Sequence, residues 1–187
     1  MAMRQAQGRY HTYQDWLKIK HDESMRVELV NGDIYMFASP SSRHQAVSME
    51  ICRLLSNYLH GKRCKVFAGP IDVRLENDTV VVPDIIVVCD PKKINNTGIE
   101  GTPDLIIEIL SPSTARHDKI TKLNLYRRTG VAEYWIVDPT DNTLTTHRLV
   151  GGEYIANAYD ETGTVTVSAL PGFEMDLSTV LTDEDEF

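Results

Sequence analysis

Two apolar runs restrict the fold of this chain more than any other feature: "TVVVPDIIVVCD" at residues 79–90 and "DLIIEIL" at residues 104–110. Runs so rich in Val and Ile are typical of strands buried on both faces, which need other elements packed on either side. Each run nevertheless contains a carboxylate, Asp84 in the first and Glu108 in the second. An ionised carboxylate in apolar surroundings is costly unless a cation or hydrogen bonds compensate it. The sequence therefore predicts a buried sheet with a positive group close to it.

Spacing and turn residues predict the other elements. Helices are expected at 12–19, at 45–60 before Gly61, and from the "SPST" turn at 111–114 to about Thr129, before Gly130. Further predictions are a hairpin about Asn31-Gly32, strands at 65–70, 71–75 and 133–139, a loop at 91–102, a β-meander over 143–170 and a short helix at 176–181. This order predicts an α/β or α+β fold, a mixed central sheet flanked by helices, and 187 residues suit a single domain.

Charge distribution bears on the partner. The net charge of -8 counts against nucleic acid, because affinity for phosphate backbones rests on Lys and Arg. Two segments are basic all the same: residues 41–65 and 114–130 each carry five Lys or Arg against one acid. The acidic tail, residues 182–187, is expected to be flexible. A DNA partner is therefore compatible with the sequence.

The spacing of the cysteines and the length of the apolar segments bear on the cellular location of the protein. Cys52, Cys64 and Cys89 are far apart and form no CxxC pair, which argues against a disulfide framework or a zinc site. The first residues lack the apolar stretch of a secretory signal, and the longest apolar runs are too short to span a membrane. We expect a cytoplasmic protein without a membrane partner.

The two strand acids predict a metal site if adjacent strands present them on one face. Asp84 and Glu108 would then offer the hard oxygen ligands that Mg²⁺, or Mn²⁺, takes while keeping several waters. The helix after Glu108 would place Asp118 and Lys122, four residues apart, over the same region. A lysine there could orient the attacking water or stabilise charge in a phosphoryl transition state. These pieces fit metal-assisted hydrolysis of a phosphodiester.

Each of these residues also has a structural interpretation. Asp84 and Glu108 could cap turns or form a buried ion pair with Lys122, and Lys122 could be an exposed helix lysine. Glu28 could join the site as an additional acid or pair across strands with Arg26 or Arg74. His44, at the start of the second helix, could contact a phosphate or serve only as a surface or capping residue.

Several quoted motifs carry a resemblance. "VELVNGDIYMFASPSSRHQ", "VVPDIIVV" and "PDLIIEILSPSTARHDKITKLNLYRRTGVAEYWIVDP" together resemble the Uma-type putative restriction endonuclease family of the PD-(D/E)XK nuclease superfamily, over about residues 26–139. The resemblance implies a restriction-endonuclease-like fold, magnesium at Asp84 and Glu108, and DNA as the substrate. Leu110 stands where the plain motif has its lysine, so Lys122 is the expected substitute, with Asp118 as its family partner.

The leading hypothesis is a metal-dependent DNA endonuclease with Asp84, Glu108 and Lys122 as catalytic residues and Glu28, His44 and Asp118 as accessory ones. The absence of a lysine at position 110 and the negative net charge favour an alternative. In this alternative the chain is a catalytically weak or inactive nuclease-fold module that binds nucleic acid or a protein. A hydrolase of small phosphodiesters would instead need an enclosed pocket. Cutting both DNA strands generally needs two active sites, so a homodimer through the exposed edges after Pro139 is expected.

Overall fold

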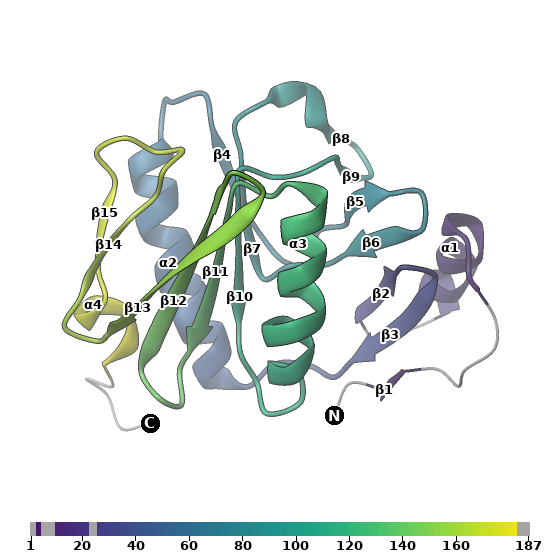
Figure 1. Cartoon of the computed structure of the whole chain (residues 1–187), viewed down its shortest axis with the longest axis horizontal. Coiled ribbons are helices and arrows are strands. Elements are labelled where there is room, and N and C mark those ends of the chain that lie inside the picture. The colour runs from purple at the N-terminus through teal and green to yellow at the C-terminus, as the bar shows by residue number, and fades with distance from the viewer. Residues whose placement is uncertain (1–2, 5–9, 23–25, 183–187) are drawn as a thin grey trace.

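A six-stranded sheet and a seven-stranded sheet lie side by side in the computed structural model, which describes residues 3–4, 10–22 and 26–182 (Figure 1). The six-stranded sheet has the order β13-β12-β11-β10-β7-β4. Its strands are β4 (Lys65–Ala68), β7 (Ile85–Val88), β10 (Leu105–Ile109), β11 (Glu133–Asp138), β12 (Thr143–Val150) and β13 (Glu153–Asp160). The β10–β11 pair is parallel and the other pairs are antiparallel, so the predicted mixed sheet is confirmed.

Helices cover both faces of this sheet, as the sequence predicts. Side chains alternate between the faces of a strand, and Ile85, Ile107 and Trp135 point into one core with the apolar side of α2 (Ser42–Leu59). Their strand neighbours Ile86 and Ile106 face the second core. That core includes residues of α3 (Leu123–Thr129), which continues a π-helical turn, η2 (His117–Lys122).

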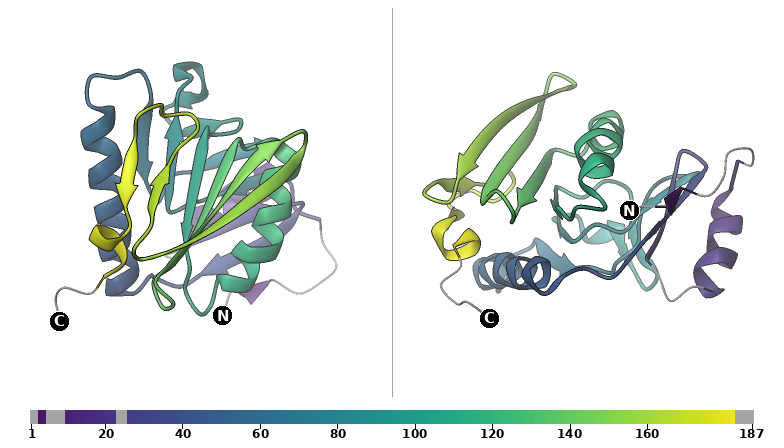
Figure 2. Two further views of the ribbon diagram at one scale, coloured as in Figure 1. Left: turned by 60° about the vertical axis from the view of Figure 1, so that its left-hand side comes forward. Right: turned by 90° about the horizontal axis from the view of Figure 1, so that it is seen from below.

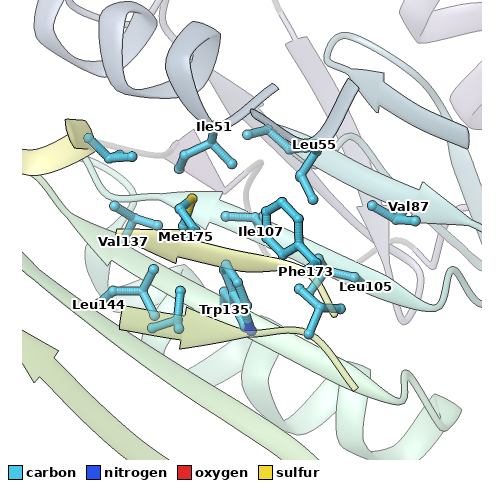
Figure 3. Close-up of a cluster of buried hydrophobic side chains, with 14 of the residues drawn as sticks. Ile51, Leu55, Val87, Leu105, Ile107, Trp135, Val137, Leu144, Phe173 and Met175 are labelled. Atoms are coloured by element: carbon cyan, nitrogen blue, oxygen red, sulfur yellow. The ribbon is translucent and has the colours of Figure 1, made fainter. Parts of the chain in front are cut away.

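The first core also takes up the end of the chain. Figure 3 shows Phe173 and Met175 beside Ile51, Ile107 and Trp135. Phe173 lies just before β15 (Glu174–Asp176), which contains Met175 and pairs with β14 (Thr164–Thr166) in a separate two-stranded sheet followed by α4 (Ser178–Leu181). The meander expected over residues 143–170 is confirmed for β12 and β13, but its last strand, β14, pairs with β15, and both present apolar side chains to the core that contains α2.

The seven-stranded sheet has the order β1-β3-β2-β6-β5-β9-β8. Its strands are β1 (Met3–Arg4), β2 (Arg26–Val30), β3 (Asp33–Phe37), β5 (Val73–Glu76), β6 (Thr79–Val81), β8 (Ile94–Asn95) and β9 (Gly98–Glu100). Helix α1 (Tyr13–Asp22) buries Trp16 against this sheet in a third core, at the right of Figure 1. The Asn31-Gly32 hairpin is confirmed, with a positive φ at both turn residues.

Two predictions of local structure are corrected. Residues 91–102 are not a plain loop: a 3₁₀ turn, η1 (Pro91–Lys93), precedes β8 and β9, because β9 finds a parallel partner in β5. The apolar run 79–90 is not one strand. It is divided at Val82, Pro83 and Asp84 into β6 and β7, which belong to different sheets. Pro83 has no N–H to continue a ladder, so the chain leaves one sheet there and enters the other.

The cysteine prediction is also corrected. Cys64 and Cys89 form a disulfide, because the pairing of Lys65 with Val88 brings the two flanking cysteines together across β4 and β7. Cys52 is a free thiol. None of the helices in the described part of the chain has the length and apolar character needed to cross a bilayer. In the predicted acidic tail, residues 183–187 lie outside the described residues.

Candidate active site

The ends of β7 and β10 bring the two strand acids together. Their antiparallel register pairs Ile86 with Ile106 and Ile85 with Ile107, so Asp84, just before β7, reaches the level of Glu108. Oδ2 of Asp84 accepts a hydrogen bond from the N–H of Ile109, 2.9 Å away, next to Glu108 in the chain. The division of run 79–90 thus places Asp84 where two sheets meet.

Glu108 belongs to a buried group centred on Lys122, whose side chain is 0% exposed. The Lys122 ammonium lies 2.8 Å from Oε1 of Glu108, 2.9 Å from Oε1 of Glu28 and 3.5 Å from Oδ1 of Asp118. The Tyr126 hydroxyl also donates to Oε1 of Glu108, at 2.9 Å. We call Glu28, Glu108, Asp118, Lys122 and Tyr126 the inner cluster.

The helix after β10 sets the geometry of the inner cluster. Asp118, Lys122 and Tyr126 follow at intervals of four residues and all three are buried, while Ile120 on the outer side is 52% exposed. Asp118 and Lys122 lie in the π-helical turn η2, whose wider turn inserts one extra residue into a helix. The helix packs this side against β10, because Glu108 faces the second core.

Asp84 has separate partners at the rim of the cluster. Its Oδ1 lies 2.8 Å from Nη1 of Arg26, and its Oδ2 lies 3.1 Å from Nε2 of His44. Ser41 caps α2 by accepting a hydrogen bond from the N–H of His44, which directs the first turn of the helix at this point. His44 is only 6% exposed, so the surface interpretation of this residue is wrong.

The environments of the two acids push their pKa values apart. Burial favours the neutral form of Asp84, but the hydrogen bond from His44 and the charge of Arg26 outweigh it and lower the pKa to about 2. For Glu108, burial and the neighbouring acids Asp118, Asp84 and Glu28 prevail over Lys122 and raise the pKa to about 8. Asp84 is therefore a carboxylate at neutral pH, whereas Glu108 largely keeps its proton.

Lys122 keeps its charge despite its burial. Desolvation by itself would lower the pKa of its ammonium, but the carboxylates of Glu108, Glu28 and Asp118 raise it above the usual value. The pKa of Glu28 is lowered against the effect of burial, chiefly by the charge of Lys122. Lys122 and Glu28 thus form the ion pair at the middle of the inner cluster.

The group contains more acid than permanent cation. Glu28, Asp84, Glu108 and Asp118 face two groups that are always charged, Arg26 and Lys122. Oε2 of Glu28 and Oδ1 of Asp118 are buried and accept no hydrogen bond from the residues that the structure describes. Within those residues, no three acid, His or Cys side chains are grouped closely enough to hold a metal by themselves. Mg²⁺ needs only one or two protein carboxylates and keeps several waters, so the donor set fits this ion.

A cavity of about 760 Å³ leads to one side of this group. Asp84, His44 and Arg26 line it, as do the first residues of α2 and the "SPST" turn before η2. Glu28, Glu108, Asp118 and Lys122 are absent from its lining. A second cavity, of about 530 Å³, is lined mainly by β2, the segment before β5 and the β8–β9 turn, and it shares Arg26 and Pro70 with the first.

The structure thus brings together all six residues singled out from the sequence: Asp84, Glu108, Lys122, Glu28, His44 and Asp118. Glu28 is in the same strand as Arg26 and in a strand that does not pair with that of Arg74, so it is not a cross-strand partner of either, and Lys122 is not exposed. Three members were missed as site residues: Arg26, Tyr126 and His117, whose Nε2 lies 3.5 Å from Oε2 of Glu28. Tyr126 was within reach of sequence reasoning, because it continues the four-residue spacing of Asp118 and Lys122. Arg26 gave no signal, since its partner Asp84 is 58 residues away.

Comparison with known proteins places this arrangement in context. The model of the family "Uma2: Putative restriction endonuclease" matches residues 10–178. Two curated proteins of Synechocystis sp. (strain ATCC 27184 / PCC 6803 / Kazusa) are similar to this chain. "Uncharacterized protein slr1290" is 28% identical over 129 residues, 68% of each chain. "Uncharacterized protein sll1609" is 29% identical over 133 residues, 68% of this chain and 74% of that protein.

A solved structure has the same fold. The crystal structure titled as a putative nuclease belonging to DUF820, from Anabaena variabilis ATCC 29413, superposes with a TM-score of 0.76 at 21% sequence identity. The match covers 91% of this chain and 97% of the other. The likeness in fold therefore extends over most of both chains.

Proposed function

This chain belongs to the Uma2 family of putative restriction endonucleases, and from that premise we propose that it is a metal-dependent endonuclease that hydrolyses phosphodiester bonds in DNA. One observation carries the proposal. Asp84 is a charged carboxylate on the wall of a cavity, next to Glu108 on the adjacent strand, in a group whose acids outnumber its permanent cations. In the metal-free chain the raised pKa of Glu108 offsets this excess of acid with a proton, and a bound cation would take the place of that proton.

Asp84 and Glu108 would hold the ion, Mg²⁺ or Mn²⁺, with Glu28 and Asp118 as the acids behind them. When bound, the ion would supply Lewis-acid catalysis, neutralising charge on the phosphate and favouring deprotonation of the attacking water. Glu108 would have to give up its proton on binding. The carboxylate set is suited to magnesium because carboxylate oxygens are hard ligands.

The protein's own residues would then divide the remaining work. His44, Arg26 and the N–H of Ile109 hold the Asp84 carboxylate in one orientation at the cavity wall. Lys122 is the group that orients the attacking water in this proposal, since its ammonium contacts Glu108. Tyr126 fixes the same oxygen of Glu108 from the next turn of the helix.

A specific observation favours the second candidate, a nuclease-fold module with weak or no turnover. Lys122 is fully buried, contacts three acids and does not line the cavity. In that case Glu108 and Lys122 would be a structural ion pair. The fold would still bind nucleic acid or a protein, but it would not hydrolyse DNA at a useful rate.

Calorimetric titration with Mg²⁺ and Mn²⁺ separates these candidates. The titrations compare the wild type with Asp84→Asn and with a matched control, Asp104→Asn. Asp104 opens the Glu108 strand and accepts a hydrogen bond from the N–H of Cys89, away from the inner cluster. We expect saturable binding in the wild type and the control, and at least tenfold weaker binding in Asp84→Asn.

Cleavage of supercoiled plasmid DNA is the second step of this experiment. The endonuclease proposal predicts metal-dependent nicking or linearisation by the wild type and by Asp104→Asn, and none by Asp84→Asn. A wild type that binds neither ion, in a preparation shown to be folded, would contradict the metal site. Metal binding without cleavage of any DNA tested would favour the module with no turnover.

We also propose a homodimer joined through β13. This strand is at the end of the six-stranded sheet and pairs on one side with β12 alone. Between Glu153 and Asp160 it carries neither charge nor proline, and Ile155 is 54% exposed. Edge strands are usually protected by charge or proline, so an unprotected one is suited to pairing with another strand. Two copies joined there would supply the two active sites that double-strand cleavage needs.

A further inference from the structure

A nuclease of this kind needs a cation that meets the phosphate of the incoming nucleic acid. Lys122, the lysine singled out from the sequence, is poorly placed for this. Its side chain is 0% exposed, its ammonium contacts Glu28, Glu108 and Asp118, and it is absent from the lining of both cavities. A phosphate that enters through the cavity would meet the Asp84 side of the site first.

Arg26 occupies that side. Among the Lys and Arg residues that the structure describes, it alone lines the larger cavity, and it also lines the smaller one. Its side chain is 24% exposed, and Nη1 lies 2.8 Å from Oδ1 of Asp84. Arg26 therefore joins the two cavities beside Asp84, the one acid among the candidate site residues that lines a cavity.

From this placement we infer that Arg26 is the phosphate-binding residue of the site and that the two cavities take the nucleotides on either side of that phosphate. The inference rests on the proposed function and adds to it the residue that receives the DNA backbone. Lys122 keeps the role proposed above, the orientation of the attacking water beside Glu108, while contact with the charge of the phosphate belongs to Arg26.

The chemistry of the guanidinium supports this assignment. It has five N–H donors in a rigid fork that matches two phosphate oxygens at once. Of the residues with a described position, only Asp84 accepts a hydrogen bond from Arg26, so donors remain for a ligand. The guanidinium carbon lies 5.3 Å from the centre of the Phe37 ring, a contact that limits the motion of the side chain. The group is thus held in place before the phosphate arrives.

The linings of the cavities fit nucleotides. The smaller cavity combines apolar side chains such as Phe67 and Ile71 with the amides of Asn95 and Asn96, a mixture suited to a base with its hydrogen-bonding edge. The larger one is lined near the "SPST" turn by the hydroxyls of Ser111 and Ser113, which suit sugar and phosphate oxygens. Arg26 lies where the phosphate between two such nucleotides would pass.

The chain offers a closely matched control for Arg26 in Arg74. Both are in the seven-stranded sheet, Arg26 in β2 and Arg74 in β5. Arg74 is 29% exposed, lies 3.8 Å from Glu100, and its guanidinium carbon is 4.2 Å from the centre of the Tyr13 ring. It lines neither of the two cavities. Arg26 and Arg74 thus share exposure, an acidic partner and an aromatic neighbour, and differ in access to the site.

The test measures the salt dependence of DNA binding. Fluorescence anisotropy gives the Kd of a labelled duplex at several KCl concentrations, with Ca²⁺ in place of Mg²⁺ to keep the DNA intact. Each phosphate contact contributes about 0.9 to the slope of log K against log[salt]. We expect Arg26→Met to reduce that slope by about 0.9 and to weaken binding, while Arg74→Met keeps the wild-type slope. Circular dichroism verifies that each variant is folded.

Arg26→Lys guards against a variant that misfolds, because it keeps the positive charge beside Asp84. It should retain the wild-type slope and bind DNA more weakly, since a lysine lacks the fork. An Arg26→Met slope equal to that of the wild type, or an equal loss in Arg74→Met, would overturn the assignment. A wild type that binds no DNA at any salt concentration would instead refute the proposed function, and with it this inference.

Discussion

Glu108 is the residue of strand β10 whose burial costs the most free energy, and it is also the residue of that strand that indicates a functional site. It interrupts an apolar run and is 1% exposed, in a place where an ionised carboxylate is expensive. The protein compensates it with Lys122 and Tyr126, yet burial and the charges of three neighbouring acids raise its pKa to about 8. If the proposed metal site is correct, Glu108 would exchange this proton for the bound ion.

The pKa of Glu108 predicts a pH dependence of stability. Its folded value of about 8 is above the ordinary 4.5, so the folded chain binds more protons than the unfolded chain between these values. The free energy of unfolding should therefore fall as pH rises through this window, by at most about 1.4 kcal/mol per pH unit. Urea titrations of the metal-free protein at pH 5 to 8 measure it, and Glu108→Gln should remove that decline.

Glu133→Gln is the matched control for this measurement. Glu133 is also 1% exposed, but it lies on β11 with Trp135 and Ser168 as hydrogen-bond donors, outside the inner cluster. The decline with pH should persist in this variant. If Glu108→Gln declines as steeply as the wild type, some other group must take up the proton. At pH near 8, Mg²⁺ should offset the loss in the wild type and not in Glu108→Gln.

At the scale of elements, the helix that follows β10 decides which side chains meet Glu108. A regular α-helix could carry Asp118 and Lys122 on one side, but this helix begins with the π-helical turn η2. Such turns amount to one residue inserted into an α-helix and are common at functional sites. The extra residue in η2 rotates α3 about the helix axis relative to the residues before η2. With this rotation, Asp118, Lys122 and Tyr126 all face β10.

Deletion of Ile120 tests this role of η2. Ile120 is 52% exposed, so its side chain contributes little to stability, while its backbone position sets the register. Removing the residue should turn the helix after it by about a quarter of a circle and take the Lys122 ammonium away from Glu28 and Glu108. We expect a loss of about 3 kcal/mol or more in the free energy of unfolding, because a buried ion pair is broken. Ile120→Ala should change it by about 0.5 kcal/mol at most.

Chemical denaturation of both variants makes the comparison. Loss of Mg²⁺ binding only in the deletion variant would connect the register of the helix with the site. Equal stability of the two variants would mean that η2 relaxes into an α-helix without disturbing the inner cluster, and that the helix register is not what holds Lys122 in place.

At the scale of the whole molecule, two sheets meet and the site lies where they do. The second core contains Val81 and Ile99 of the seven-stranded sheet together with Ile106 and Tyr134 of the six-stranded one. The right-hand view of Figure 2, seen from below, shows the two groups of strands spread to either side, with the α3 helix near their junction. Arg26 and Glu28 come from one sheet and Glu108 from the other. The candidate site therefore depends on the packing of the sheets against each other.

The proposed dimer makes a prediction at this scale. If β13 pairs with its copy, light scattering during gel filtration should give about twice the chain mass of 21.1 kDa. Ile155→Lys places a charge at the edge and should shift the protein toward the monomer. Ile120→Lys places a charge at a similarly exposed isoleucine of η2, outside the six-stranded sheet, and should leave the mass unchanged. A wild-type monomer at high concentration would contradict the dimer.

Much of this protein was determined by local sequence. The Asn31-Gly32 turn, the helices at 45–60 and after "SPST", and the β-branched runs follow from residue types and spacing, which depend on near neighbours. Local sequence also distinguishes Asp84 and Glu108, because each is a lone charge within an apolar run. These features can be predicted from sequence because the spacing of apolar residues and the preferences of turn-forming residues act within a few positions of the chain.

Only the tertiary structure decided how these pieces are joined. It divides the run 79–90 between two sheets, pairs Cys64 with Cys89, and places Arg26 against Asp84. It also makes Lys122 the buried centre of three acids. Such contacts join residues far apart in the chain. The local pattern of residues predicts that a side chain is buried, but it does not predict which other side chain it contacts. The choice of partner is made by packing, when the two sheets and the helix close over the same core.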